Sequence, residues 1–229
     1  MEIETKVPIL NPTEDLEKIF DYNLCNTGNV EFGRAKLLLK SDKYYFSQFY
    51  ESKKFLRIRS EKIQSGFELR ICDFINDCLK RDLPPHLNVE TSAVTLTSKD
   101  KTVNSHGYEE NIEAETDLGN VDVSDLEKTF EVFGLFKKFE KNKLSVMFQL
   151  LDEPFNVEFV YAFGDDWTKG KWYCEIETTD ELQERYGTKD WGIDEYEARI
   201  LAIFAHIGLD IKNRDNRSWV EILGLKETQ

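Results

Sequence analysis

Charged residues at alternate positions are the part of this sequence with the clearest chemical meaning. Glu2, Glu4 and Lys6 follow one another at this spacing near the start of the chain, and Arg57 and Arg59 repeat it. Strand side chains alternate between two faces, so the members of each group share one face of a strand. Three further pairs have the same spacing: Glu113 with Glu115, Lys141 with Lys143, and Glu175 with Glu177.

These groups are sorted by sign, because apart from Lys6 each of them contains only acids or only bases. One charged face on a single strand is typical of a one-sided antiparallel sheet whose outer face meets solvent. Several such strands with sorted charges indicate instead an enclosed site with one acidic wall and one basic wall.

The chemistry of such a site follows from its two walls. Carboxylates brought close together repel one another unless a cation lies between them, and hard oxygen ligands suit Mg²⁺ or Mn²⁺. Clustered lysines and arginines bind polyanions, and the arginine fork matches phosphate oxygens. Both walls together predict a site for a metal–polyphosphate complex, in which the metal polarises a phosphoryl oxygen and orients a water molecule.

Short alternating runs predict the strands that position these residues. The predicted strands are Glu2–Pro8, Tyr44–Tyr50, Lys54–Arg59, Gly66–Ile71, Ala93–Ser98, Asn111–Leu118, Phe136–Phe139, Lys143–Leu150, Asn156–Phe163 and Lys171–Thr178. The predicted helices are Asp15–Leu24, a helix that begins at Ser124 with Glu127 completing a capping box, Glu195–Ile207 and Arg217–Leu223. Many antiparallel strands with a few helices outside them predict an α+β fold or a closed barrel.

The composition restricts the class of protein. The chain has 229 residues and a formal net charge of −14, which does not suit binding to duplex nucleic acid. No apolar run approaches the roughly 18 residues of a membrane span, and the polar start Met1–Pro8 is not typical of a signal peptide. Four cysteines without a CxxC pair argue against a zinc or disulfide framework and favour the cytoplasm. No linker-like stretch divides the chain, so we expect one domain over residues 1–229.

The ordered set of motifs resembles the CYTH domain, whose members are also called triphosphate tunnel metalloenzymes. Glu2-Ile3-Glu4-Thr5-Lys6 resembles the ExExK signature of that family, and Asp165 lies ten residues before Glu175, as an acidic residue often does there. The other matching segments, in family order, are Leu56–Arg59, Asn111–Glu115, Phe139–Lys143, Tyr173–Glu177 and the terminal helix Arg217–Leu223.

The resemblance implies an eight-stranded antiparallel β-barrel tunnel with flanking helices, a divalent metal (Mg²⁺ or Mn²⁺) and a triphosphate substrate. It makes Glu2, Glu4 and Lys6 the catalytic candidates, with the two glutamates binding metal or positioning the attacking water. The metal site would be completed by Glu175 and Glu177, with Asp165, Glu113 and Glu115 near it. The phosphate-binding residues would be Lys6, Arg57, Arg59, Lys141 and Lys143.

The fourth basic strand of the family has two candidates in this chain. Arg70 follows the arginine pair at the usual distance, whereas Lys99 closes the family-like run Thr95-Leu96-Thr97-Ser98-Lys99 and directly precedes the acidic strand. We favour Lys99, which makes residues 72–91 an insertion.

Hydrolysis of a triphosphate is the activity we expect, with inorganic triphosphate, thiamine triphosphate and nucleoside triphosphates as the possible substrates. Cyclisation of ATP to cyclic AMP is the first alternative, but the chain lacks the His-Phe pair that the cyclase branch carries before its second strand. A tunnel that binds polyphosphate or nucleotide without turnover is the second alternative. A one-sided sheet that binds a protein partner is the third.

Overall fold

The computed structural model describes residues 2–12, 14–16, 19, 32–47, 55–64, 91–103, 105, 107–119 and 121–225. Arg70 and most of the expected insertion, residues 72–90, lie outside the described residues. The strand positions of Glu2, Lys99 and Glu113 are described, but their side chains lie outside what the structure describes.

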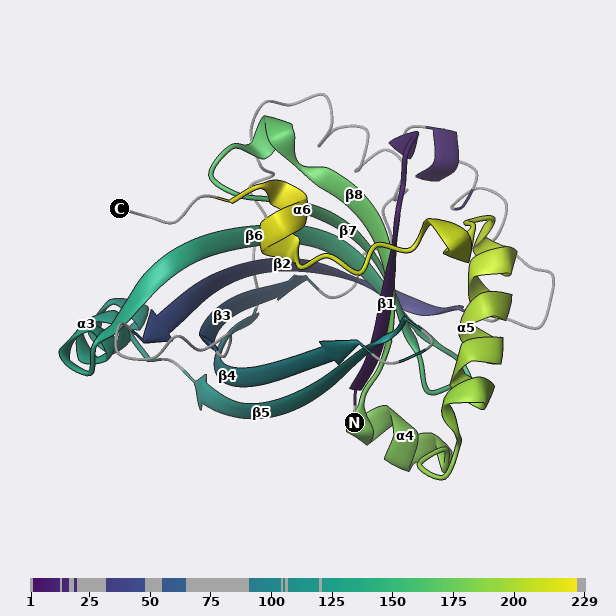
Figure 1. The fold of residues 1–229 in the computed structure, drawn as a ribbon, viewed down its shortest axis with the longest axis horizontal. Coiled ribbons are helices and arrows are strands. Elements are labelled where there is room, and N and C mark those ends of the chain that lie inside the picture. The colour runs from purple at the N-terminus through teal and green to yellow at the C-terminus, as the bar shows by residue number, and fades with distance from the viewer. Residues whose placement is uncertain are drawn as a thin grey trace.

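Eight strands form the body of the molecule, and every neighbouring pair is antiparallel (Figure 1). They are β1 (Glu2–Pro8), β2 (Phe32–Ser47), β3 (Phe55–Gln64), β4 (Thr91–Val103), β5 (Glu109–Gly119), β6 (Leu135–Leu150), β7 (Asn156–Phe163) and β8 (Lys171–Thr178). Their order is β1-β5-β4-β3-β2-β6-β7-β8, and β1 pairs with both β5 and β8, so the ring of pairing closes. The expected eight antiparallel strands are therefore confirmed.

Several strands have other bounds than the sequence predicted. β1, β7 and β8 have the predicted bounds, whereas β2 begins at Phe32 rather than at Tyr44. The two strands expected over Phe136–Phe139 and Lys143–Leu150 are one continuous strand, β6. The predicted strand Gly66–Ile71 lies outside the described residues.

The described helices are α3 (Val123–Val132), α4 (Asp180–Tyr186), α5 (Ile193–Ile207) and α6 (Trp219–Leu223), with short 3₁₀ turns η1 (Trp167–Lys169) and η2 (Ile211–Asn213). The N-cap of α3 is Asp122 rather than Ser124, because the Asp122 carboxylate accepts from the Ser124 backbone N–H. A capping box occurs at α6 instead, between Ser218 and Glu221. At the N-terminal end of the chain, residues 12, 14–16 and 19 are helical. No helix in the described ranges is long and apolar enough to cross a membrane.

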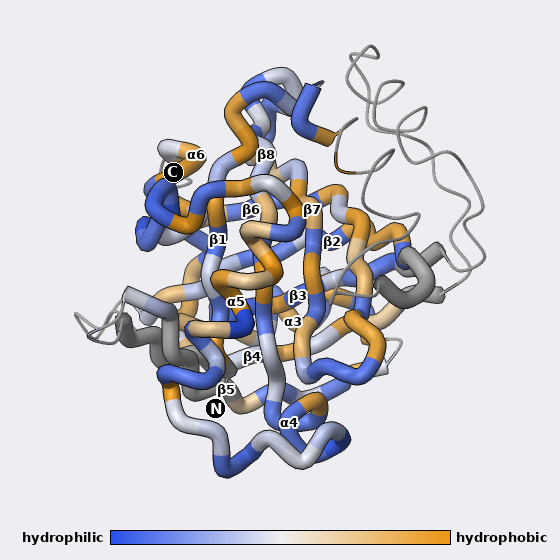
Figure 2. Tube along the Cα trace, turned by 90° about the vertical axis from the view of Figure 1, so that its right-hand side faces the viewer, coloured by the Kyte–Doolittle hydropathy of each residue, from blue (hydrophilic) through white to orange (hydrophobic). Residues whose placement is uncertain are grey.

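The largest apolar cluster lies outside the strand ring, between the strands and the helices, whereas a smaller one belongs to the inner face and consists of Val160, Ala162, Tyr173 and Trp219. Ile200, Ile203 and Phe204 of α5 pack with Ile3 of β1 and Ile176 of β8, and all five side chains are fully buried. Figure 2, which looks onto α5, shows hydrophobic segments in this helix and in the strands behind it. A second cluster beneath α3 covers the outer face of β3 and β4. Because apolar residues take the outer face, the alternate residues of each strand are left for the inner face.

Candidate functional site

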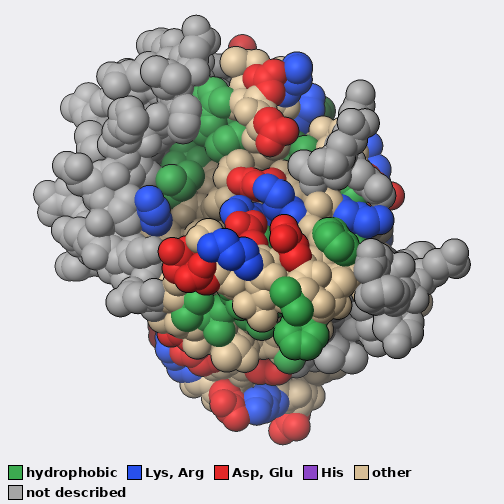
Figure 3. Space-filling view, turned by 90° about the vertical axis from the view of Figure 1, so that its left-hand side faces the viewer, with side chains coloured by type: hydrophobic (Ala, Val, Ile, Leu, Met, Phe, Trp, Pro, Cys, Tyr) green, Lys and Arg blue, Asp and Glu red, His purple; other side chains and the backbone are tan. Residues whose placement is uncertain are grey.

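The strand register collects the alternate charged residues on the inner face of the ring. Glu4 lies opposite Glu177, and Lys6 lies opposite Glu175, across the pair β1–β8. Directly opposed residues of antiparallel strands point to the same face. At one end of the molecule, Figure 3 shows Lys and Arg side chains gathered beside Asp and Glu.

The structure brings together most of the residues that the sequence singled out. Nine of them have described side chains on this face: Glu4, Lys6, Arg57, Arg59, Glu115, Lys141, Lys143, Glu175 and Glu177. Lys99 and Glu113 pair with each other, and Glu2 pairs with Asn111, so their strand positions belong to the same face. The functional roles of these residues stay predictions.

Asp165 is the exception, because the structure does not bring it to the inner face. β7 ends at Phe163, and Asp165 lies exposed in the bend that follows. The pKa of Lys137, at the start of β6, is raised mainly by its hydrogen bond to Glu140, and the charge of Asp165 adds to this rise. The spacing of ten residues before Glu175 therefore does not carry Asp165 to the other carboxylates.

Glu158 of β7 belongs to the inner face, but the sequence analysis did not select it because it is not part of a charged pair. It is directly opposite Glu175, is 2 % exposed, and accepts from Lys40 Nζ at 2.8 Å and Ser145 Oγ at 2.5 Å. Burial alone would raise the pKa of Glu158, but the ammonium groups of Lys40 and Lys143 outweigh it and lower that pKa to about 2. Glu158 is the only charged residue of β7, whose other residues are apolar except Asn156, and this was the signal that could have identified it.

Glu175 is held by two donors from different parts of the chain. Lys143 Nζ lies 2.5 Å from one carboxylate oxygen, and Trp219 Nε1 donates to the other at 2.8 Å. The Lys143 ammonium group also lies 4.9 Å from the centre of the Trp219 ring. Trp219 packs on Tyr173, which shares the inner face of β8 with Glu175. The Trp219 side chain of α6 therefore contacts the inner face of the ring.

Glu177 has a raised pKa although the Lys40 ammonium group acts to lower it. Burial is the largest cause that raises its pKa, and the negative charges of Glu158, Glu4 and Glu175 raise it further. Asn156 Nδ2 donates to it at 3.4 Å. A carboxylate with these neighbours is stabilised in its charged form by an added cation.

The donor chemistry on this side of the ring fits a hard divalent cation, because it consists of carboxylates. Among the residues that the structure describes, however, no three such side chains are already gathered around one point. The carboxylates on this side are Glu4, Glu158, Glu175 and Glu177. Glu158 and Glu175 form ion pairs with lysines. A cation would therefore compete with Lys40 and Lys143 for these oxygens.

The basic side of the ring contains an acid that the sequence analysis did not select. Asp42 of β2 accepts from Arg59 Nε at 2.7 Å and from Arg59 Nη2 at 3.0 Å, and Lys141 Nζ lies 2.9 Å away. Arg57 Nη2 donates to Thr97 Oγ1 at 3.2 Å, and Thr97 Oγ1 donates to Glu115 at 3.3 Å.

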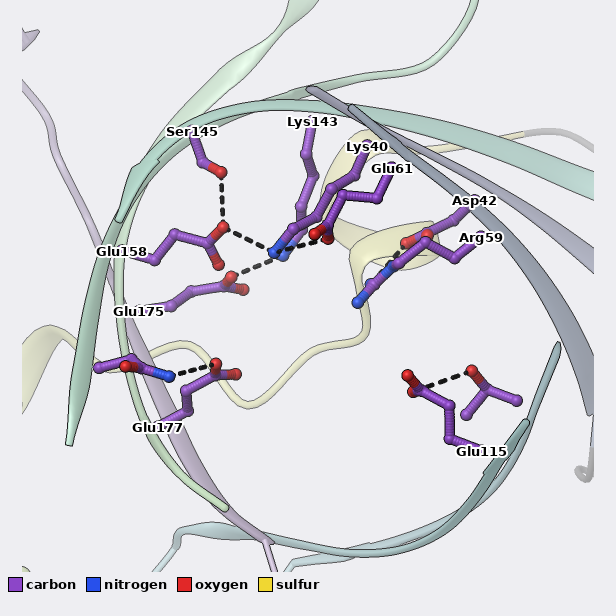
Figure 4. Close-up of polar contacts among 12 residues, drawn as sticks. Lys40, Asp42, Arg59, Glu61, Glu115, Lys143, Ser145, Glu158, Glu175 and Glu177 are labelled. Atoms are coloured by element: carbon purple, nitrogen blue, oxygen red, sulfur yellow. Dashed lines mark hydrogen bonds and ion pairs between the residues drawn. The ribbon is translucent and has the colours of Figure 1, made fainter. Parts of the chain in front are cut away.

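Figure 4 shows how these groups lie in the interior. Glu158, Glu175 and Glu177 come from the left of the view, Lys40 comes from the top, and Arg59 comes from the right. Lys40 and Lys143 reach the acids as ion pairs, so the walls are joined by salt bridges rather than being purely acidic and purely basic. Asp42 of β2 and Lys6 of β1 also lie among residues of the opposite charge, so, contrary to the prediction, the interior is not divided into one acidic and one basic wall.

No protein-family model matches the chain, and no curated protein matches it in sequence. Solved structures do share its fold. A protein from Pyrococcus horikoshii has 16 % sequence identity, with 97 % of this chain and 98 % of that chain covered at a TM-score of 0.62. A protein from Vibrio parahaemolyticus, described as a candidate adenylate cyclase, has 15 % identity, with 97 % of each chain covered and a TM-score of 0.54.

A third structure of this fold comes from Hippeastrum and is described as a candidate adenylyl cyclase with a dominant triphosphatase activity. It has 12 % identity, with 98 % of this chain and 95 % of that chain covered at a TM-score of 0.50. At these identities the comparisons concern the fold alone. The chain has the fold of these proteins, in agreement with the resemblance of its motifs to the CYTH domain.

Proposed function

We propose that the protein is a metal-dependent triphosphatase whose substrate lies inside the strand ring. The observation that carries this proposal is the register of the charged pairs, which places Lys6 opposite Glu175 and Glu4 opposite Glu177 on one enclosed face. Carboxylates and cations within one interior are what a metal–polyphosphate complex requires.

The cations of the ring would hold the triphosphate. Arg57 and Arg59 come from β3, and Lys141 comes from β6. Lys6 lies opposite Glu175 on β8, and Lys143 forms an ion pair with the same glutamate. When water attacks the terminal phosphorus, charge grows on the departing diphosphate, and fixed cations beside it stabilise the transition state more than the ground state.

The carboxylates would orient the attacking water and accept its proton. Glu4 and Glu177 are opposed across β1–β8, and we assign these two carboxylates to the attacking water. Glu4, Glu158, Glu175 and Glu177 are the residues that would hold the divalent cation. When bound, Mg²⁺ or Mn²⁺ would polarise a phosphoryl oxygen of the substrate.

Product analysis with three substrates tests the proposal. The purified protein is incubated with inorganic triphosphate, ATP or thiamine triphosphate, each with Mg²⁺, with Mn²⁺ or with EDTA. Orthophosphate release that EDTA abolishes supports the triphosphatase. Cyclic AMP and pyrophosphate from ATP would instead support a cyclase, and binding without any product would support a polyphosphate-binding protein without turnover.

A substitution in the acidic side separates this site from a contaminating phosphatase. Glu4→Gln keeps the size of the side chain and removes its charge, so turnover should be lost while the fold remains. Asp125→Asn is the matched control, because Asp125 is an exposed acid of α3 outside the ring. Full activity of Glu4→Gln would remove Glu4 from the catalytic machinery.

A further inference from the structure

Asp42 is a fully buried acid in the middle of the proposed phosphate-binding side. It lies on β2, opposite Arg59 on one neighbouring strand and opposite Lys141 on the other. Its carboxylate receives two hydrogen bonds from the Arg59 guanidinium, at 2.7 and 3.0 Å, and an ion pair from Lys141 at 2.9 Å. A negative charge among residues that would bind an anion needs a physical explanation.

The order of burial shows that Asp42 lies behind the two cations. Its side chain is 0 % exposed, against 3 % for Lys141 and 20 % for Arg59. Figure 4 shows Asp42 near the strand and the tip of Arg59 directed toward the interior. The guanidinium group has five N–H donors, and Asp42 takes one from Nε and one from Nη2. A phosphate can therefore approach the remaining donors from the interior without displacing Asp42.

The charges of this cluster depend on one another. Burial alone would raise the pKa of Asp42, but Arg59, Lys141 and Arg57 outweigh it and hold that pKa well below its ordinary value. Asp42 therefore stays ionised at neutral pH. Its charge offsets the repulsion between two cations that a polyphosphate site needs side by side, and its two hydrogen bonds fix the plane of the guanidinium.

We propose that Asp42 is a positioning residue for polyphosphate: it holds Arg59 and Lys141 against the wall of the ring so that their inward donors meet the phosphate oxygens in a fixed geometry. This proposal rests on the proposed function of the ring. In the opposite role, Asp42 would compete with phosphate for the N–H donors of Arg59 and Lys141 and so weaken phosphate binding. The two roles predict changes of opposite sign.

Glu61 supplies a matched control for the effect of charge alone. It lies on the same face of β3, two positions from Arg59, with 25 % of its side chain exposed, and its ion-pair partner Lys40 is 3.9 Å away. Glu61→Gln removes one negative charge from the interior without touching Arg59. Removal of a nearby negative charge by itself strengthens anion binding, so Glu61→Gln should bind phosphate anions equally well or more tightly.

Calorimetric titration with inorganic triphosphate in EDTA, without turnover, gives the affinities of the wild type and the two variants. We expect Asp42→Asn to weaken binding about tenfold or more, because the fixed direction of the Arg59 donors is lost. In an Arg59→Lys background the same substitution should have a much smaller effect, because the lysine side chain has no guanidinium plane to be held. This dependence on Arg59 would not arise from a general loss of structure.

The buried cations left by Asp42→Asn could prevent folding, and a second comparison covers that case. The double variant Asp42→Asn/Lys141→Met keeps the net charge that Asp42, Arg59 and Lys141 have together in the wild type. It differs from Lys141→Met in the Arg59 contact and in one negative charge, and loss of that charge by itself would strengthen anion binding. We expect the double variant to bind more weakly than Lys141→Met. Equal or tighter binding by Asp42→Asn, or by the double variant relative to Lys141→Met, would overturn the positioning role and leave the proposed function standing. No binding of triphosphate by the wild type, either in EDTA or with Ca²⁺ in place of the catalytic metal, would overturn both proposals.

Discussion

Substitution of Lys143 by methionine tests whether the charged interior is as dry as the structure indicates. Lys143 Nζ and Glu175 Oε2 are 2.5 Å apart, and their side chains are only 7 % and 5 % exposed. Removal of one partner from a buried ion pair leaves the other charge without compensation, which costs about 3–5 kcal/mol. For a chain of this length, that loss corresponds to a fall in melting temperature of roughly 6–20 °C.

The double variant Lys143→Met/Glu175→Gln supplies the control. It removes both charges, and the glutamine oxygen can still accept from Trp219 Nε1, which donates to Glu175 at 2.8 Å. Replacement of a whole buried pair by neutral groups is often neutral in stability. We therefore expect the double variant to recover most of the free energy of unfolding that the single variant loses.

The pH dependence of this effect follows from the pKa of Lys143. Burial alone would lower that pKa, but Glu175, Glu158 and Glu4 outweigh it and raise it above its ordinary value. A raised lysine pKa stabilises the fold fully below the ordinary value, and the contribution is lost only as the pH rises through the folded value. The full effect should therefore be present at pH 7.

Urea denaturation of the wild type, the single variant and the double variant at pH 7 provides the measurement. A loss below about 1 kcal/mol in Lys143→Met is the value for an exposed ion pair. That result would refute the conclusion that Lys143 and Glu175 meet in a water-poor interior.

Three further predictions concern individual carboxylates. Glu177→Gln should raise the free energy of unfolding at pH 7 by about 0.5–2 kcal/mol. The raised pKa of Glu177 means that its charged form destabilises the fold above that pKa, and this destabilisation disappears as the pH falls through the pKa. A less stable variant in urea denaturation would contradict this. The lowered pKa of Glu158 stabilises the fold above its ordinary value near 4.5, and that contribution should be lost as the pH falls toward about 2; melting curves of Glu158→Gln should show less loss over this range than the wild type. Asp165→Asn should leave kcat/KM for a triphosphate unchanged, because Asp165 lies exposed in the bend after β7; a tenfold fall would return it to the site.

The inner face could be predicted from the sequence because its period is set by strand geometry alone. Glu4 and Lys6 on β1, and Glu175 and Glu177 on β8, are alternate residues whichever strands they pair with. The apolar residues between them, such as Ile176, form the outer core beneath α5. The alternation of residues therefore predicted which residues are charged on each strand and that they share one face of it.

The full length of two strands could not be predicted, because the polar side of this sheet faces inward. Residues 40–43 of β2 and 140–142 of β6 are mostly polar or charged, which in an ordinary sheet is typical of a turn. In this ring they are paired on both sides, as Lys40 with Lys143 and Asp42 with Lys141. The acid that organises the basic side was missed for this reason.

The contacts that hold the carboxylates arise only from the tertiary arrangement. Trp219 reaches Glu175 across 44 positions of the sequence, and Lys40 reaches Glu158 across 118. No local pattern specifies such a pair, because each partner is a single residue in its own segment. The sequence could indicate the residue types of the site, but not which ion pairs they form before a ligand arrives.

A crystal structure of the protein with a non-hydrolysable analogue of inorganic triphosphate and Mn²⁺ tests the central claim most directly, because the anomalous signal of manganese locates the metal independently of the phosphate. We predict the analogue inside the strand ring, in contact with Arg59 and Lys143, and manganese beside Glu177. An analogue bound only on the outer surface, or an interior whose ion pairs are unchanged at saturating ligand, would contradict the claim that the ring is the site of triphosphate binding.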